Sequence, residues 1–457
     1  MLICDNLCLS VAVLSACIRV IRGLDFRGLA LCLLVAWSMS GCARPAHSRP
    51  PAAALVSVAG VDAAEPAVAT SSDGSIYVAW VEHFDGQANV MVEHFDISGA
   101  YTTPATRVNP NSGEATAWRG DPPSLAVSSD GTLYVAWTAR VPEKSHATNL
   151  YISVSRDKGE TFEKPVKIND HETPGAHGMH SLVIGSDGTV YVSWLEDPKK
   201  PSHEKSNLRS HKISDQKSQE PKQGHKHMEE NRNVFVAFST NGGKTFSSKT
   251  QVAGDACPCC KTSLAVAPNG RVYASWRQVL PGNFRHIAVA AIANRGQPAS
   301  TRVIVSDDKW MLAGCPVSGS SLSVSSDGTL QVLWYADGQA GPKGVYRAES
   351  RNGGQSFSPR QLIAEGMVQG TPIILRQSDR TFAVWQRGQG IEANVLTASI
   401  DSKGVVPSSI TEELNSQLPA AAIIGDRVVL AAVHQTADDR RSIWFVVRPA
   451  FLESLTH

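Results

Sequence analysis

Alternating apolar and polar positions mark one stretch of the chain as a β-hairpin. Residues Pro123 to Trp137 (PSLAVSSDGTLYVAW) place apolar and β-branched residues on either side of a Ser-Asp-Gly turn. Asp130 and Gly131 supply the turn chemistry that two short antiparallel strands require. A single hairpin of this kind is common, so the pattern becomes informative only when it recurs.

The same pattern returns along the chain at a period of roughly 50 residues, which is typical of a β-propeller. Copies run from Pro66 to Trp80, His180 to Trp194, Thr262 to Trp276, Ser320 to Trp334 and Thr371 to Trp385, with a degraded copy from Leu418 to Val433. A tryptophan closes every copy except the last. We therefore expect these indoles to pack between neighbouring blades.

The strand count predicts how the propeller closes. Each repeat contains two further strands, but the last repeat is one strand short of a four-stranded blade. Leu55–Ala59 precedes the first repeat and can supply that strand by pairing with Ser442–Arg448. We expect residues 55–449 to form an all-β propeller, with seven blades favoured and an N-terminal closing strand. Six blades remain the alternative, because the last copy is degraded.

A second recurring motif connects the two outer strands of several repeats. Residues Ser155 to Phe162 read SRDKGETF, in which Asp157 can accept backbone N–H groups, Gly159 allows a positive φ and Phe162 can fill the gap below. Related stretches are Ser239–Phe246 and Ser350–Phe357, with Asn in place of Asp. The motif resembles the Asp-box, or BNR repeat, of the sialidase superfamily, and the resemblance covers most of residues 55–448.

The resemblance implies a sialidase-like propeller, but the sialidase catalytic residues have no clear counterparts. Sialidases bind the substrate carboxylate with three arginines and use a tyrosine nucleophile assisted by Glu, with an Asp acid/base. The nearest candidates here are Arg119, Asp121, Arg277 and Arg387. Arg119 stands two positions out of register with the family's first arginine, and no tyrosine occupies an obvious nucleophile loop. The sequence therefore argues against a true sialidase and keeps an exo-glycosidase of sialidase type as an alternative.

The N-terminal residues predict export and a lipid anchor. Arg22 and Arg27 precede an apolar run from Leu29 to Met39, which ends in Ser40-Gly41-Cys42. A basic flank, a short apolar core and small residues before a cleavage point describe an export signal over residues 1–42. Its ending resembles a bacterial lipoprotein signal, which implies lipidation of Cys42; an ordinary signal peptide is the alternative. Residues 43–54, rich in Pro and Ala, predict a flexible tether.

Charge and composition limit the classes of partner that the chain is expected to bind. The net charge is +1, so no electrostatic case for nucleic acid exists. We expect a monomer that is attached by its lipid anchor to a membrane in the bacterial periplasm or outer membrane. Its other expected partner is a glycan or a periplasmic protein. An insertion at 197–231 is rich in Lys, Glu, Ser and His, which predicts a mobile loop, with metal capture by its histidines as the alternative.

Four cysteines and two histidines are the candidate metal ligands. Loops that enter consecutive blades share one face, so Cys257, Cys259, Cys260 and Cys315 are expected to meet His177 and His180 near the channel mouth. Thiolate and imidazole ligands suit copper or zinc. Disulfide formation competes with this interpretation, because exported proteins meet oxidising conditions. One bridge could also leave two thiols as ligands.

Three functions follow from these patterns. The first is a lipid-anchored propeller with a Cys/His metal site that serves copper handling or a redox step. The second is an exo-glycosidase acting on sialic acid or another glycan. The third is a disulfide-stabilised scaffold that binds a protein or peptide. The sequence leaves open whether the chain is an enzyme; if it is, it is an exo-α-sialidase-like or a metal-dependent one.

Overall fold

The computed structural model describes residues 54–116, 120–141, 147–170, 175–198, 230–293, 299–378, 380–435 and 440–449. In these ranges the regular structure is β-strand apart from two 3-10 turns, η1 (Gly390–Glu392) and η2 (Pro407–Ser409). No helix there is long and apolar enough to cross a membrane. The predicted export signal with Cys42, nearly all of the tether and residues 199–229 of the insertion lie outside the described residues.

The strands form antiparallel sheets in which successive strands pair. The first sheet contains β2 (Asp62–Thr70), β3 (Ile76–Phe84), β4 (Gln87–Phe95) and β5 (Tyr101–Arg107). The second contains β6 (Ser124–Val127), β7 (Leu133–Arg140), β8 (Thr148–Ser155) and β9 (Val166–Lys167). In both, the predicted hairpin supplies the first two strands.

Two more sets of four strands are joined into one larger sheet. They are β10 (His177–Ile184), β11 (Val190–Glu196), β12 (Arg232–Ser239) and β13 (Thr250–Ala256), then β14 (Ser263–Val266), β15 (Val272–Leu280), β16 (Phe284–Ala291) and β17 (Val303–Ile304). The join is a single pairing between Ala256 of β13 and Gln278 of β15. The residues that follow Ala256 therefore lie directly beside the next set of strands.

The remaining sheets complete the chain. They are β18 (Ser320–Val324), β19 (Leu330–Ala336), β20 (Gly344–Ser350) and β21 (Gln361–Glu365); β22 (Ile373–Gln377), β23 (Arg380–Arg387), β24 (Asn394–Asp401), β25 (Gly404–Val405) and β26 (Thr411–Glu413); and β27 (Gln417–Ile424), β28 (Arg427–Gln435), β29 (Arg441–Pro449) and β1 (Ala54–Leu55). In the last sheet Ala54 pairs with Phe445 and Leu55 with Trp444. The N–H of Val56 then donates to the carbonyl of Ile443 at 2.9 Å.

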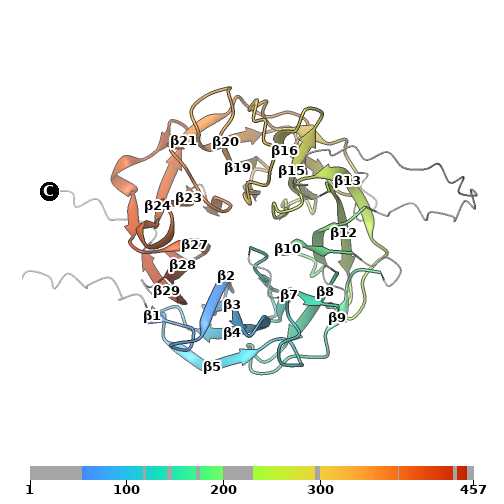
Figure 1. Cartoon of the computed structure of the whole chain (residues 1–457), viewed down its shortest axis with the longest axis vertical. Helices are drawn as coiled ribbons and strands as arrows, with labels where there is room; N and C mark the ends of the chain where they lie inside the picture. Colours follow the sequence, from blue (N-terminus) through green and yellow to red (C-terminus); the bar gives the residue numbers. More distant parts are fainter. Residues whose placement is uncertain are drawn as a thin grey trace, which may run out of the picture. The chain divides into compact units, whose positions relative to one another are not determined.

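The first strands of the sheets pack side by side around a common axis, as Figure 1 shows. Their order is β2, β6, β10, β14, β18, β22 and β27, and β27 packs beside β2. This arrangement is an all-β propeller. A serine at one hairpin position joins neighbouring first strands: Ser181, Ser263 and Ser321 accept the N–H groups of Leu264, Leu322 and Ile374 respectively.

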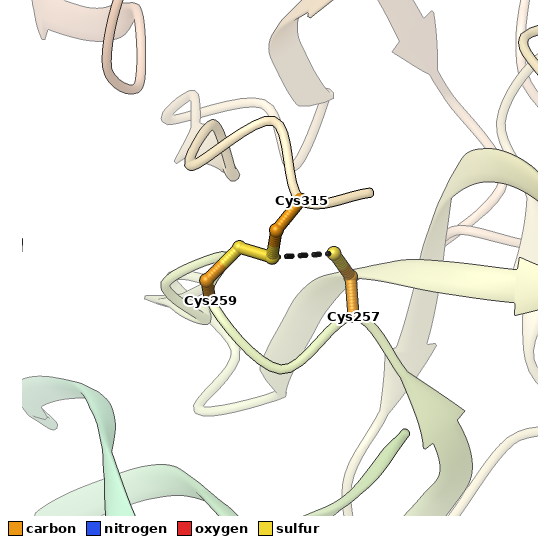
Figure 2. Close-up of side chains that lie close together, drawn as sticks. All are labelled: Cys257, Cys259 and Cys315. Atoms are coloured by element: carbon orange, nitrogen blue, oxygen red, sulfur yellow. Dashed lines mark hydrogen bonds between the residues drawn. A yellow bond between two sulfur atoms is a disulfide. The ribbon is translucent and has the colours of Figure 1, made fainter. Parts of the chain in front are cut away.

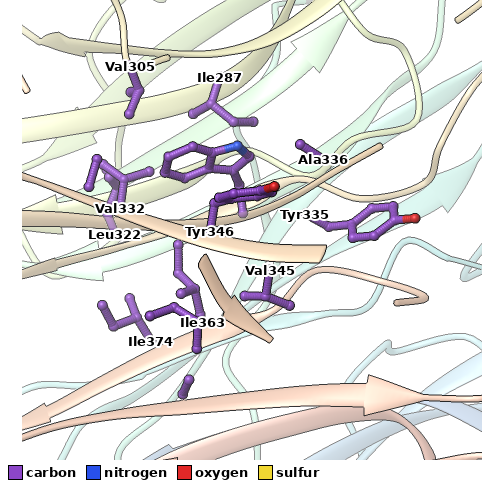
Figure 3. Packing of buried hydrophobic residues seen from close by; sticks show 14 of the residues in the cluster. Ile287, Val305, Leu322, Val332, Tyr335, Ala336, Val345, Tyr346, Ile363 and Ile374 are labelled. Atoms are coloured by element: carbon purple, nitrogen blue, oxygen red, sulfur yellow. The ribbon is translucent and has the colours of Figure 1, made fainter. Parts of the chain in front are cut away.

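The hydrophobic core lies between neighbouring sheets. The indoles of Trp80, Trp194, Trp276 and Trp334 are completely shielded from solvent, as expected of residues that fill the space between blades. Figure 3 shows one such region, where Ile287 and Val305 of one set of strands pack with Leu322, Val332 and Tyr346 of the next. Burial of these faces is the main stabilising term of the fold.

The turns predicted to be Asp-boxes join each blade to the one before it. Asp157 accepts the N–H of Thr161 at 3.0 Å, and Asn241 accepts that of Thr245 at the same distance. Gly159 has φ +89° and lies against Leu133 and Val92 of earlier strands. A side chain at this position would strain the turn, whereas its Cβ would meet Leu133 and Val92 at an ordinary contact distance of 3.7 Å.

Candidate functional site

The four cysteines of residues 54–449 meet where two neighbouring blades begin. Cys257, Cys259 and Cys260 follow β13 and precede β14, and Cys315 lies in the loop that precedes β18. Cys259 and Cys315 form a disulfide between the two loops (Figure 2), and Cys257 and Cys260 are free thiols. The structure therefore brings together cysteines that the sequence separates by 56 positions.

One of the free thiols touches the disulfide, and the two free thiols touch each other. The Cys257 sulfur lies 3.6 Å from the Cys315 sulfur and 3.4 Å from the Cys260 sulfur. The sulfurs of Cys257, Cys259 and Cys315 all lie within 4.8 Å of one another. Among the described residues this is the group of sulfur, imidazole and carboxylate ligands that is compact enough for a metal ion.

Hydrogen bonding, burial and nearby charge give the two thiols different pKa values. The Cys260 S–H donates to Cys257, and this hydrogen bond, together with the charges of Arg285 and Arg277, lowers the pKa of Cys257 to about 7. Burial raises the pKa of Cys260. Cys257 is thus the thiol that ionises near neutral pH, and Cys260 stays protonated as its hydrogen-bond donor.

Two arginines hold positive charge beside this sulfur group. Arg277 is fully buried and donates to the carbonyls of Ser318 at 2.7 Å and Tyr335 at 2.9 Å. The Nη1 atom of the buried Arg285 and the hydroxyl of the buried Ser318 have no hydrogen-bond partner among the described residues. Unpartnered buried polar atoms are rare, so the surroundings of the cysteines retain unused capacity to bind an anion or a polar ligand.

The two predicted histidine ligands face other groups. His177 contacts the carbonyl of Thr148 through Nδ1 at 2.6 Å, and its Nε2 lies 3.5 Å from the Glu196 carboxylate. Burial lowers the pKa of His177. His180 contacts the carbonyl of Ala136 through Nε2 at 2.9 Å, and its Nδ1 lies 3.5 Å from Asp121. Neither imidazole belongs to the compact sulfur group.

Residues next to the cysteines connect the site to the first strands of the propeller. Met179 is buried in the same apolar cluster as Cys257, Cys259 and Cys260, whereas Met311 is exposed. Burial lowers the pKa of Lys261 to about 8, and its ammonium donates to the carbonyl of Pro122 at 3.2 Å. Met179 therefore packs in the same part of the hydrophobic core as three of the four cysteines.

The candidate catalytic residues are spread over different environments. Arg119 lies outside the described residues. Asp121 is buried and accepts the N–H of Met179 at 2.8 Å. Arg277 binds backbone carbonyls, and the exposed Arg387 forms an ion pair with Glu412 at 2.6 Å. Asp121, Arg277 and Arg387 thus have separate partners.

Two polar side chains near the starts of the loops that leave the hairpins accept hydrogen bonds from the tryptophans. The indole N–H of Trp194 donates to Glu196 at 3.1 Å, and that of Trp276 donates to Gln278 at 2.8 Å. Cys257 and Cys260 also have the C-x-x-C spacing of thiol pairs with unequal pKa values, a feature that was not among the expectations above. That spacing was visible in the chain, whereas Arg285 and Ser318 carried no local signal.

No family model and no curated protein matches the chain. Among solved structures, an ulvan lyase of a polysaccharide lyase family is 10% identical, with a TM-score of 0.54 over 85% of this chain and 96% of that one. A protein of unknown function from Dyadobacter fermentans is 14% identical, with a TM-score of 0.47 over 87% of this chain and 98% of that one. The NanB sialidase from Streptococcus pneumoniae is 10% identical, with a TM-score of 0.44 over 82% and 83%. At such low identity, the likeness to the ulvan lyase supports the fold alone.

Proposed function

We propose that the chain is an exported β-propeller that binds a soft metal ion, copper(I) in the first place and zinc as the alternative, through its four-cysteine site. The observation that carries the proposal is the convergence of three cysteine sulfurs within 4.8 Å of one another. Thiolates are the ligands that copper(I) prefers, and zinc also accepts them. The Cys259–Cys315 disulfide must be reduced before all these sulfurs can act as thiolates.

Electrostatics supports an anionic metal–thiolate complex. A copper(I) ion with two or three thiolates carries net negative charge, which is costly to bury without compensation. Arg277 and Arg285 provide positive charge beside Cys257. Metal affinity should fall as pH drops below about 7, because the Cys257 thiolate must give up its metal to accept a proton.

The test is metal binding by the full-length protein under anaerobic reducing conditions. We expect about one copper(I) ion more per chain in the wild type than in a Cys257→Ser/Cys259→Ser variant, measured by competition with a chromophoric chelator. The five N-terminal cysteines are common to both proteins, so the difference reports on the site. Equal metal content in the two proteins would contradict the proposal.

A further variant decides whether an imidazole completes the site. The predicted ligand set includes His177 and His180, which require rearrangement of their contacts with Thr148 and Ala136. A tenfold or greater loss of copper affinity in His180→Ala would assign His180 as a ligand or as support for one. Unchanged affinity would restrict the site to sulfur.

The architecture and location belong to the same proposal. The circular order of the first strands, and the pairing of β1 with β29, favour seven blades closed by the N-terminal strand. The lipoprotein-like ending Ser40-Gly41-Cys42 favours attachment to a bacterial membrane in the periplasm. Metabolic labelling with a palmitate analogue, lost in Cys42→Ser, tests the anchor.

Glycan degradation is the second candidate, because the ulvan lyase shares the fold over most of both chains. The separate environments of Asp121, Arg277 and Arg387 argue for absent or feeble sialidase activity. Release of a fluorescent group from a sialoside, lost in Arg119→Ala, would favour the glycosidase instead.

A further inference from the structure

The cysteine site contains two cysteine pairs in contact, one oxidised and one reduced. One is the Cys259–Cys315 disulfide, and the other is the thiol pair of Cys257 and Cys260. The Cys257 sulfur lies 3.6 Å from Cys315 and 3.4 Å from Cys260, so it touches a member of each pair. No other cysteine occurs among the described residues. Cys257 is therefore placed to transfer a disulfide between the two pairs.

The direction of approach suits displacement. Thiol–disulfide exchange requires the attacking sulfur to approach one disulfide sulfur while the other leaves. Figure 2 shows the Cys257 sulfur meeting the Cys315 sulfur on the side away from Cys259. Attack at Cys315 would therefore release Cys259.

Exposure differs between the two pairs. Cys315 is exposed on its loop, whereas Cys257, Cys259 and Cys260 are buried. An external thiol can thus reach the disulfide at Cys315 and cannot reach the Cys257–Cys260 pair directly. Access through one sulfur to a buried pair is what a relay needs.

We propose that the four cysteines form a thiol–disulfide exchange relay, which passes a disulfide between the buried Cys257–Cys260 pair and an external protein dithiol that meets Cys315. The Cys257 thiolate first forms a bond to the Cys315 sulfur, and the Cys259 sulfur leaves with the electron pair and takes up a proton. The Cys260 sulfur then loses its proton as it bonds to Cys257, and the Cys315 sulfur leaves with the electron pair and takes up a proton. The same steps in reverse return the disulfide to Cys259 and Cys315. There one thiolate of the external dithiol bonds to Cys315 and releases Cys259, and its second thiolate then closes the external disulfide and releases Cys315. One disulfide is broken and one formed at each step, so no oxidant is consumed.

The relay goes beyond the proposed metal site and does not depend on it. Exchange moves a disulfide among the same sulfurs without any metal. It also determines which of these sulfurs are free to bind a metal ion. The test is therefore made on metal-free, full-length protein in the presence of a chelator. Failure of metal binding and failure of exchange are then separate results.

The experiment maps the disulfide in glutathione buffers of graded redox ratio. Samples are quenched with acid, the free thiols are alkylated, and the protected thiols are then reduced and given a second label for mass spectrometry. In the wild type we expect a fraction of molecules in which Cys257 and Cys260 are protected while Cys259 and Cys315 are free. Cys257→Ser should lower protection of Cys260 at least tenfold.

A matched variant interrupts the relay one step later. In Cys260→Ser, only the return attack of Cys259 can resolve the Cys257–Cys315 disulfide, which should accumulate at least tenfold over its wild-type level. Absence of that disulfide would overturn the relay even if Cys257→Ser failed to fold. Free Cys257 and Cys260 at every redox ratio in the wild type would overturn it as well.

Discussion

Two arginines that follow hairpin tryptophans show how burial decides the role of a side chain. Arg277 is the first residue after Trp276, and Arg387 is the second residue after Trp385. Arg277 is fully buried against backbone carbonyls and lies 4.7 Å from the centre of the Trp310 ring. Arg387 is exposed and has only Glu412 as its ion-pair partner among the described residues. Arg277 is thus a structural cation inside the molecule and Arg387 a surface charge, although each closely follows a hairpin tryptophan.

Replacement of Arg277 by Met should destabilise the protein by about 3–5 kcal/mol, because several buried carbonyls would lose their donor. Arg387→Met should cost at most about 1 kcal/mol, since exposed ion pairs contribute little. Urea unfolding of both variants measures the difference. Similar losses for the two would contradict the assigned role of Arg277.

The ionisation of Cys257 gives a second prediction for a single residue. Thiolate absorbance near 240 nm should rise with a midpoint near pH 7 in the difference between wild type and Cys257→Ser. In Cys260→Ser, where the neighbouring S–H donor is lost, the pKa of Cys257 should move upward. An unchanged midpoint in Cys260→Ser would show that the hydrogen bond is not the main cause.

Among the elements, the turns that join outer strands act as spacers between blades. Gly243 has φ +82°, and a Cβ there would lie 3.1 Å from Val154 and 3.3 Å from Tyr134. Gly188 has a similar φ of +79° in a hairpin turn, but a Cβ there would meet nothing within 4 Å. Substitutions at these two glycines therefore distinguish the energetic cost of the left-handed backbone from the cost of packing a methyl group.

Gly188→Ala should cost about 1 kcal/mol for the left-handed backbone alone. Gly243→Ala should cost a further 1–3 kcal/mol or so, because the methyl group must displace neighbouring side chains. Thermal unfolding of the two variants provides the comparison. Equal shifts in Tm would mean that the turn does not press against the preceding blade.

For the whole molecule, the contacts between the two ends of the described chain are expected to stabilise the folded state. Ser57 accepts the N–H of Ile443 at 2.9 Å, and Arg441 forms a two-point ion pair with Asp62 at 2.8 and 3.0 Å. These contacts join residues more than 370 positions apart in the chain. They should make unfolding depend on the N-terminal segment.

Val56 and Val58 test that dependence. Val56 is buried against the last sheet, whereas Val58 is 60% exposed. Val56→Asp should destabilise the protein by about 3 kcal/mol or more, because it buries an unpaired carboxylate, and Val58→Asp should be nearly neutral. Chemical denaturation measures both, and a neutral Val56→Asp would contradict a stabilising role for residues 54–57.

The sequence by itself determined the repeating elements. Alternating apolar residues, a turn residue pair and a closing tryptophan recur, and each encodes a local preference that is independent of the rest of the chain. The hairpins, the turns at Asp157, Asn241 and Asn352, and the all-β class could be predicted for this reason. Cys257 and Cys315 could also be placed together, because loops at equivalent positions of consecutive blades must be neighbours.

Only the tertiary structure decided the partners of individual side chains. Whether His180 meets a sulfur or Asp121, and whether Arg277 points to solvent or to the carbonyl of Tyr335, depends on side-chain directions and on packing between blades. The pairing of Cys259, rather than Cys257, with Cys315 is of the same kind. Hydrogen bonds and sulfur contacts depend on distances of a few tenths of an ångström, which a repeat pattern does not encode.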